Sequence, residues 1–116
     1  MPVKRLHVGP RLSEVAIHNS VVYLAGQVAD DPTQDAGGQT RQILAAIDRL
    51  LAEAGSDKSL LLQVTIFLAD IADFPAMNAA WDQWVLQGHT PPRATVEAKL
   101  ARPDYRVEIK AIAAQR

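Results

Sequence analysis

The stretch that decides the fold is PPRATVEAKL at residues 91–100, followed by ARPDYRVEIKAIA at residues 101–113. Its even positions from 94 to 100 are apolar and its odd positions from 93 to 99 are polar, a period of two that indicates a β-strand with one wet face. Residues 107–113 alternate in a similar way, and Arg102-Pro103-Asp104 has turn chemistry. The pattern therefore predicts a β-hairpin with its loop at residues 101–104, in which Thr95 faces Lys110 and Glu97 faces Glu108.

Such a hairpin would place five polar side chains on one sheet surface, namely Arg93, Thr95, Glu97, Glu108 and Lys110. This row has two interpretations. Charged alternation usually forms the solvated face of a half-buried sheet. An arginine among carboxylates can also form an anion site, because its planar fork binds a carboxylate in two places and stays charged. The pattern alone leaves both interpretations open.

Three further strands are expected near the start of the chain, at residues 3–8, 14–18 and 21–29. Asn19-Ser20 has the composition of a tight hairpin turn between the second and third of them. Gly26 interrupts the third strand. A glycine at such a position marks either a bulge or a place where another backbone or a ligand comes close.

Two helices are expected farther along. Ile and Leu recur with a period of 3.6 in residues 39–54, after a polar loop at residues 30–38 and before Gly55, a suitable left-handed cap. A second helix should begin at Asp73, which can cap it, and end at Gly88. Asn78 lies beside its apolar stripe and either solvates something local or offers an amide to a ligand. The stripe places both tryptophans in the core and consists of Phe74, Met77, Trp81, Trp84 and Val85.

Residues 61–69 form a nearly continuous apolar strand, which predicts a central position in the sheet with burial on both faces. The element order favours a single α+β domain over residues 1–116, with one mixed or antiparallel six-stranded sheet and two helices packed on one face. The uncovered face, with the Arg93 and Glu108 row, then meets either water or another subunit.

Composition excludes several classes of function. The chain has 116 residues, a net charge near -1 and scattered basic residues, which gives no electrostatic basis for binding nucleic acid or membranes. It has no cysteine, which excludes disulfides and thiolate chemistry and fits a cytoplasmic location. The three histidines lack partners at metal-ligand spacing, and no phosphate loop or nucleophile elbow is present. Of the kinds of catalysis considered, acid-base or water-activating chemistry by Arg93 and a glutamate is the one that remains.

Residues 91–97 and 107–113 together resemble the signature of the Rid family, the YjgF-type reactive intermediate (imine) deaminases. The resemblance extends to Gly26-Gln27, to residues 64–70 and to Asp73-Phe74 with Asn78, so it covers nearly the whole chain. Residues 67–85 and 89–91 are most similar to the YoaB-like branch.

The resemblance implies a chorismate-mutase-like α+β fold and a homotrimer with a central barrel and sites at the subunit interfaces. It also implies hydrolysis of 2-imino acids, or their enamine tautomers, to 2-oxo acids and ammonia without a cofactor or metal. By analogy with the family, Arg93 binds the substrate carboxylate and Glu108 positions a water and takes its proton. Gly26, Asn78 and Thr95 match positions that line the pocket.

Three departures from the family pattern bear on the substrate. Active members carry a tyrosine where this chain has Leu12 or Ser13, a serine where it has Ala25, and often a cysteine where it has Thr95. The lost hydroxyls leave the carboxylate clamp intact, so we expect a substrate preference that differs from that of the housekeeping members, toward larger or more polar imino acids. The alternative function is a non-catalytic trimeric binder or sensor of small 2-oxo acids, in which Glu108 is structural.

Overall fold

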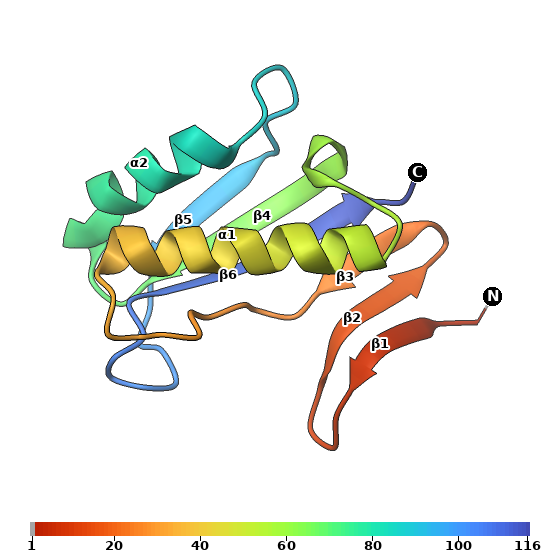
Figure 1. Cartoon of the computed structure of the whole chain (residues 1–116), viewed down its shortest axis with the longest axis horizontal. Coiled ribbons are helices and arrows are strands. Elements are labelled where there is room, and N and C mark those ends of the chain that lie inside the picture. The colour runs from red at the N-terminus through yellow and green to blue at the C-terminus, as the bar shows by residue number, and fades with distance from the viewer. Residues whose placement is uncertain (1) are drawn as a thin grey trace.

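Six strands form one mixed sheet in the order β1-β2-β3-β6-β4-β5. The structure is a computed structural model and describes residues 2–116. The α+β class, with a six-stranded sheet and two helices on one face, is confirmed (Figure 1). The elements in chain order are β1 Lys4–Val8, β2 Ser13–His18, β3 Val21–Leu24, α1 Ala36–Glu53, the 3-10 turn η1 Lys58–Leu60, β4 Leu61–Leu68, the 3-10 turn η2 Ile71–Asp73, α2 Phe74–Trp84, β5 Arg93–Glu97 and β6 Val107–Ala114.

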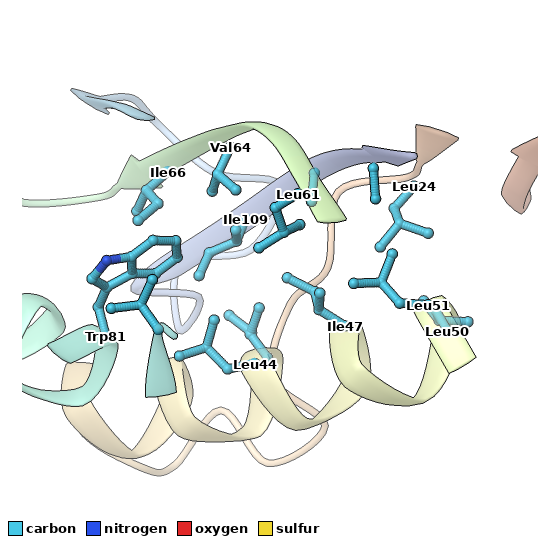
Figure 2. Packing of buried hydrophobic residues seen from close by; sticks show 14 of the residues in the cluster. Leu24, Leu44, Ile47, Leu50, Leu51, Leu61, Val64, Ile66, Trp81 and Ile109 are labelled. Atoms are coloured by element: carbon cyan, nitrogen blue, oxygen red, sulfur yellow. The ribbon is translucent and has the colours of Figure 1, made fainter. Parts of the chain in front are cut away.

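The hydrophobic core lies between the sheet and the two helices. Figure 2 shows Leu44 and Ile47 of α1 directed at Ile109 of β6 and Leu61 of β4, while Trp81 of α2 packs toward Ile66. Each buried Leu or Ile contributes about 1.5–3 kcal/mol before the loss of conformational entropy. In Figure 1 the β1–β2 hairpin extends beyond the helices, and β1 is correspondingly exposed except at Leu6.

Helix α1 begins three residues earlier than the sequence predicted. Asp35 has an extended backbone, and its carboxylate accepts a hydrogen bond from the Gly38 backbone N–H at 2.8 Å. An N-cap of this kind satisfies a backbone donor of the first turn, so Gly37 and Gly38 lie inside the helix and the preceding loop ends at Asp35. The predicted end is confirmed, because Gly55 has φ +76° directly after the helix.

The predicted hairpin of β5 with β6 is wrong. Strand β4 lies between them and pairs with β5 in parallel and with β6 antiparallel. The connection from β4 through α2 to β5 is a βαβ unit, and such a unit makes its two strands parallel. As a result Thr95 is opposite Ile66 and Lys110 is opposite Thr65, so the predicted facing pairs do not exist.

Strand β4 is an interior strand, as predicted, but it lies beside the edge strand β5 rather than at the centre of the sheet, and it is buried on one face only. Val64, Ile66 and Leu68 face the helices and are buried. On the other face Phe67 is half-buried and Leu62 is 46% exposed. Burial on both faces is therefore wrong for the single chain.

Strand β3 ends at Leu24, five residues before its predicted end. Tyr23 is opposite Ile112, and the next bridge joins Gln27 to Ile109. Three residues (24–26) therefore lie opposite two (110–111), which is a one-residue bulge. The bulge predicted at Gly26 is confirmed. The Asn19-Ser20 turn is confirmed too, with φ values of 50° and 62°.

Helix α2 begins where it was predicted, although Asp73 does not cap it. Asp73 has φ -81° and ψ 1°, which is not the extended backbone of a capping residue, and its side chain accepts no capping bond. Its carboxylate instead lies 3.6 Å from the Arg106 guanidinium. Trp81 is buried and Trp84 packs at the edge of the core, as predicted. The helix ends at Trp84, before Gly88.

No helix within residues 2–116 is long and apolar enough to cross a membrane.

Candidate functional site

Arg93 is the first residue of β5 and lies on the helix side of the sheet. It is opposite Val64 of β4, whose side chain is buried under the helices. Residues that are opposite each other on adjacent strands point to the same face. The guanidinium carbon of Arg93 lies 5.2 Å from the ring centroid of Trp81 and 6.0 Å from that of Phe74, both on α2.

The Arg93 side chain has no anionic partner of its own in the described part of the chain. It is half-buried, yet it forms no salt bridge and no side-chain hydrogen bond within residues 2–116. Burial lowers the pKa of its guanidinium, and the negative charge of Asp82 partly opposes that shift. An arginine nevertheless stays protonated in proteins. A half-buried cation without a counter-ion favours the binding of an anionic ligand.

Two of the predicted site residues share the helix side of the sheet with Arg93. Thr95 lies two residues along β5, and its Oγ1 is buried without a hydrogen-bond partner within residues 2–116. Asn78 of α2 is half-buried and lies four residues after Phe74 and three before Trp81. This spacing puts all three residues on one helix face, the face that presents both rings to Arg93. The hydroxyl and the amide are available to a ligand held by Arg93.

Glu108 lies on the opposite, uncovered face. It is opposite Phe67 of β4, and Ile109 beside it points into the core. An added Cβ at Gly26 would overlap Oε2 of Glu108 and lie 3.0 Å from its Cδ, so any side chain there would force the Glu108 carboxylate to move. Gln27 and Ile109 exchange backbone hydrogen bonds of 2.8 and 3.1 Å that hold the two segments together. Of the two predicted meanings of Gly26, the bulge applies, and the group that comes close to this glycine is the Glu108 side chain instead of a backbone or a ligand.

The single polar surface predicted from the sequence is wrong. Arg93, Thr95 and Glu97 are opposite the buried residues of β4, whereas Glu108 and Lys110 are opposite Phe67 and Thr65 on the uncovered face. Because β4 lies between β5 and β6, each of these two strands pairs with β4 and not with the other. In the resulting register the polar residues of β5 lie on the helix side of the sheet and those of β6 lie on the uncovered side.

Glu97 and Lys110 have no evident part in a site. The Glu97 carboxylate accepts a hydrogen bond from the Ile71 backbone N–H at 3.0 Å, which holds the η2 turn. Lys110 is exposed.

The uncovered face carries exposed apolar side chains in two groups. Phe67, which is half-buried, and Val96, which is 42% exposed, lie beside Glu108, whereas Tyr23, Leu62 and Ile112 lie toward the other end of β6, beyond Lys110 and Thr65. Exposed apolar side chains that gather on one face favour an interaction site.

Gln39 supports the site and was not singled out from the sequence. Its fully buried amide donates to the Pro32, Gln34 and Asp104 carbonyls at 3.0–3.1 Å, and its Oε1 accepts from the Arg106 N–H at 2.9 Å. These bonds fix the start of β6 just before Glu108. The sequence does contain a sign of this role, because Gln39 is a polar residue on the apolar stripe of the helix, four residues before Ile43.

Leu12 precedes β2, and Ala25 follows β3 directly before Gly26. Leu12 is 56% exposed in the turn after β1, and the Ala25 N–H donates to the Glu14 carbonyl at 2.9 Å. Neither side chain can donate or accept a hydrogen bond.

A cavity of about 670 Å³ lies at the other end of β5, lined by residues 97–103 with Ala69 and Tyr105. Neither Arg93 nor Glu108 lines it. Within residues 2–116 no three His, Asp or Glu side chains gather in a way that could hold a metal ion.

Residues 3–115 match the family described as Endoribonuclease L-PSP. The chain is similar to RutC family protein YoaB of Escherichia coli K12, at 50% identity over 114 residues that cover 98% of this chain and 99% of that protein. It is 34% identical to a 2-iminobutanoate/2-iminopropanoate deaminase of Capra hircus, covering 93% of this chain and 82% of that protein. The crystal structure of a YjgF family member from Neisseria meningitidis matches with a TM-score of 0.97 at 46% identity, covering 100% of this chain and 97% of that one.

Proposed function

Because this chain belongs to the Endoribonuclease L-PSP family, which includes the YjgF and RutC proteins, we propose that it hydrolyses 2-imino acids or their enamine tautomers to 2-oxo acids and ammonia. The observation that carries the proposal is Arg93, a half-buried guanidinium with aromatic rings beside it and no anionic partner within residues 2–116. The name of the deaminase from Capra hircus, 34% identical, supports the reaction class.

The proposed site is completed by a second copy of the chain. Arg93 and Glu108 lie on opposite faces of one sheet, so a small substrate bound at Arg93 has the sheet between it and Glu108 of the same copy. The uncovered face that carries Glu108 can instead bind a neighbouring copy of the chain. The edge strand β5 of that neighbour then brings the neighbour's Arg93 close to Glu108. We propose a homotrimer with one site at each interface, Arg93 and Thr95 coming from one copy and Gly26 and Glu108 from the next.

In the proposed reaction Arg93 binds the substrate carboxylate through two N–H groups and fixes the imine carbon in reach of a water molecule. Glu108 accepts a proton from that water as the oxygen bonds to the imine carbon, and the nitrogen takes up a proton. The hydroxyl proton of the resulting tetrahedral carbinolamine passes through Glu108 to the amino nitrogen as the C–N bond breaks and the carbonyl forms. The products are the 2-oxo acid and ammonia, so one water is consumed and no redox step is needed.

The remaining site residues have positioning roles in this proposal. The unpartnered Thr95 hydroxyl and the Asn78 amide are donors for the substrate carboxylate or the imine nitrogen. Gly26 leaves room for the Glu108 carboxylate. Ala25 supplies no hydroxyl, and Leu12 or Ser13 stands in place of the family tyrosine, so water is held by different groups and the substrate preference differs from that of members with serine and tyrosine there.

The family description names an endoribonuclease. Ribonuclease activity has less support in this chain, because its net charge is -1 and its basic residues are scattered. The second candidate is a binder of small 2-oxo acids without turnover, and the missing serine at Ala25 and the missing tyrosine in the Leu12/Ser13 region favour it. In that case Arg93 grips the carboxylate and Glu108 is structural.

The test generates imines in situ with an amino-acid oxidase from a panel of amino acids and follows imine decay with and without the protein. We expect accelerated decay for at least one class of amino acid. No acceleration above buffer for any of them, together with calorimetric binding of a 2-oxo acid, contradicts the deaminase and supports the binder.

A further inference from the structure

Two aromatic rings flank the guanidinium of Arg93. Trp81 and Phe74 are seven residues apart on α2, which is two helical turns, and both rings lie within 6.0 Å of the Arg93 guanidinium carbon. A guanidinium packs against aromatic rings through its flat face. The N–H groups around its edge then remain free for a carboxylate in the guanidinium plane.

Trp81 is itself held firmly. It is 6% exposed, and its ring lies 5.4 Å from that of Trp84 at an interplanar angle of 51°. The Trp84 indole N–H donates to the Asp48 carboxylate of α1 at 2.9 Å. Lys58 donates to the Trp84 carbonyl at 2.6 Å and lies over the Trp84 ring at 5.1 Å. These contacts from α1 and η1 fix Trp84, which packs against the Trp81 ring beside Arg93.

We propose that Trp81 is a positioning residue that orients the Arg93 guanidinium toward the substrate carboxylate. Arginine side chains are usually oriented by an acidic partner, and Arg93 has none within residues 2–116. A free arginine loses much rotamer freedom when it binds a ligand, and a fixed ring reduces that loss. The inference rests on the proposed function, since it concerns the same carboxylate clamp.

The experiment compares Trp81→Leu, which removes the ring, with Trp81→Phe, which keeps a smaller one. Trp84→Leu is the graded comparison, because it removes the neighbour that supports Trp81 but leaves the ring beside Arg93 in place, so its effect should be smaller than that of Trp81→Leu. We expect Trp81→Leu to raise KM and the Kd of a 2-oxo acid by about five- to thirtyfold, the range that corresponds to a partly desolvated cation–π contact. Because the ring acts on binding and not on the chemical step, kcat should stay within about threefold.

Trp81→Phe should recover most of the affinity, and Trp84→Leu should change it by less than about threefold. If Trp81→Leu fails to fold, Phe74→Leu decides, because Phe74 is 37% exposed at the edge of the core. We expect that variant to raise KM by about two- to fivefold. A folded Trp81→Leu variant with wild-type KM and Kd overturns the inference, and where Trp81→Leu does not fold, wild-type KM and Kd in Phe74→Leu overturn it.

The two proposals fail in different ways. If the wild-type protein hydrolyses no imine but binds a 2-oxo acid, and Trp81→Leu weakens that binding, the deaminase is wrong and the role of Trp81 stands. If the wild-type protein is active and a folded Trp81→Leu variant keeps its KM, the deaminase stands and the role of Trp81 is wrong.

Discussion

Arg93 and Glu108 lie on opposite faces of the same sheet. Arg93 is opposite Val64, which is buried under the helices, and Glu108 is opposite Phe67, which is on the uncovered face. The two residues that the proposed reaction requires therefore cannot reach one small substrate from a single copy of the chain.

Replacing Arg93 tests the carboxylate clamp. Loss of one partner of a desolvated, charge-assisted contact costs about 2–5 kcal/mol, so Arg93→Ala should lower kcat/KM about 30-fold to several thousandfold. Arg93→Lys should also lose activity, because an ammonium cannot replace the two-pronged contact of a guanidinium. Steady-state imine hydrolysis measures both effects. An Arg93→Ala variant with full activity would refute the assignment.

Gly26→Ala tests the close approach to Glu108. The new Cβ would overlap the Glu108 carboxylate, which is the movable end of a side chain, so we expect the fold to survive and the carboxylate to shift. Loss of a well-placed general base lowers kcat by about 10²–10⁴.

Gly37→Ala is the control for Gly26→Ala, because its added Cβ would meet nothing nearer than 3.5 Å inside α1. It should keep full activity and gain about 0.5–1 kcal/mol in the free energy of unfolding. Equal activities of the two variants argue against the placement of Glu108.

Gln39→Leu tests the buried amide that fixes the start of β6. The change leaves three carbonyls and the Arg106 N–H without their partner, and we expect a loss of about 3 kcal/mol in the free energy of unfolding by urea. Gln42→Leu removes a more exposed glutamine from the same helix, whose Oε1 accepts from the Asp31 N–H, and should cost less than about 1 kcal/mol. Similar losses in the two variants would contradict the anchoring role of Gln39.

Asp57 provides a test by pH. Hydrogen bonds from the Ser59 hydroxyl and backbone N–H lower the pKa of the Asp57 carboxyl, and the charge of Arg116 adds to the effect. A lowered folded-state pKa stabilises the protein above the unfolded-state pKa, and this stabilisation disappears as the pH falls through the folded-state pKa. Ser59→Ala should raise the pKa of Asp57 in an NMR titration, and its stability deficit should shrink in acid. An unchanged pKa of Asp57 would contradict this account.

The local parts of the fold follow from the sequence because they depend on neighbouring residues. The 3.6-residue stripe from Ile43 to Leu51 determines α1, and Asn19-Ser20 determines the turn between β2 and β3. Period-two alternation correctly shows which residues of β5 share a face. It correctly grouped Arg93 with Thr95 for this reason.

The partners of β5 and β6 could not be obtained from alternation. A period of two shows which residues of one strand share a face, but it does not show which strand lies beside it. The βαβ connection from β4 through α2 inserts β4 between the two segments and places Glu108 on the other face from Arg93. The contact of Arg93 with Trp81 depends on the same connection, and no spacing in the sequence indicates it.

Subunit complementation tests most directly whether the site combines two copies. Arg93→Ala and Glu108→Gln are each unfolded and refolded alone, and then as an equimolar mixture. Each variant alone should be inactive. In the mixture half of the copies supply an intact Arg93 and half an intact Glu108, so roughly a quarter of the interfaces in a symmetric oligomer should regain both groups. Imine hydrolysis that reappears in the mixture, at up to about a quarter of the wild-type rate, is the result we predict. A mixture that stays inactive, although native mass spectrometry shows mixed oligomers, would contradict a site shared between copies.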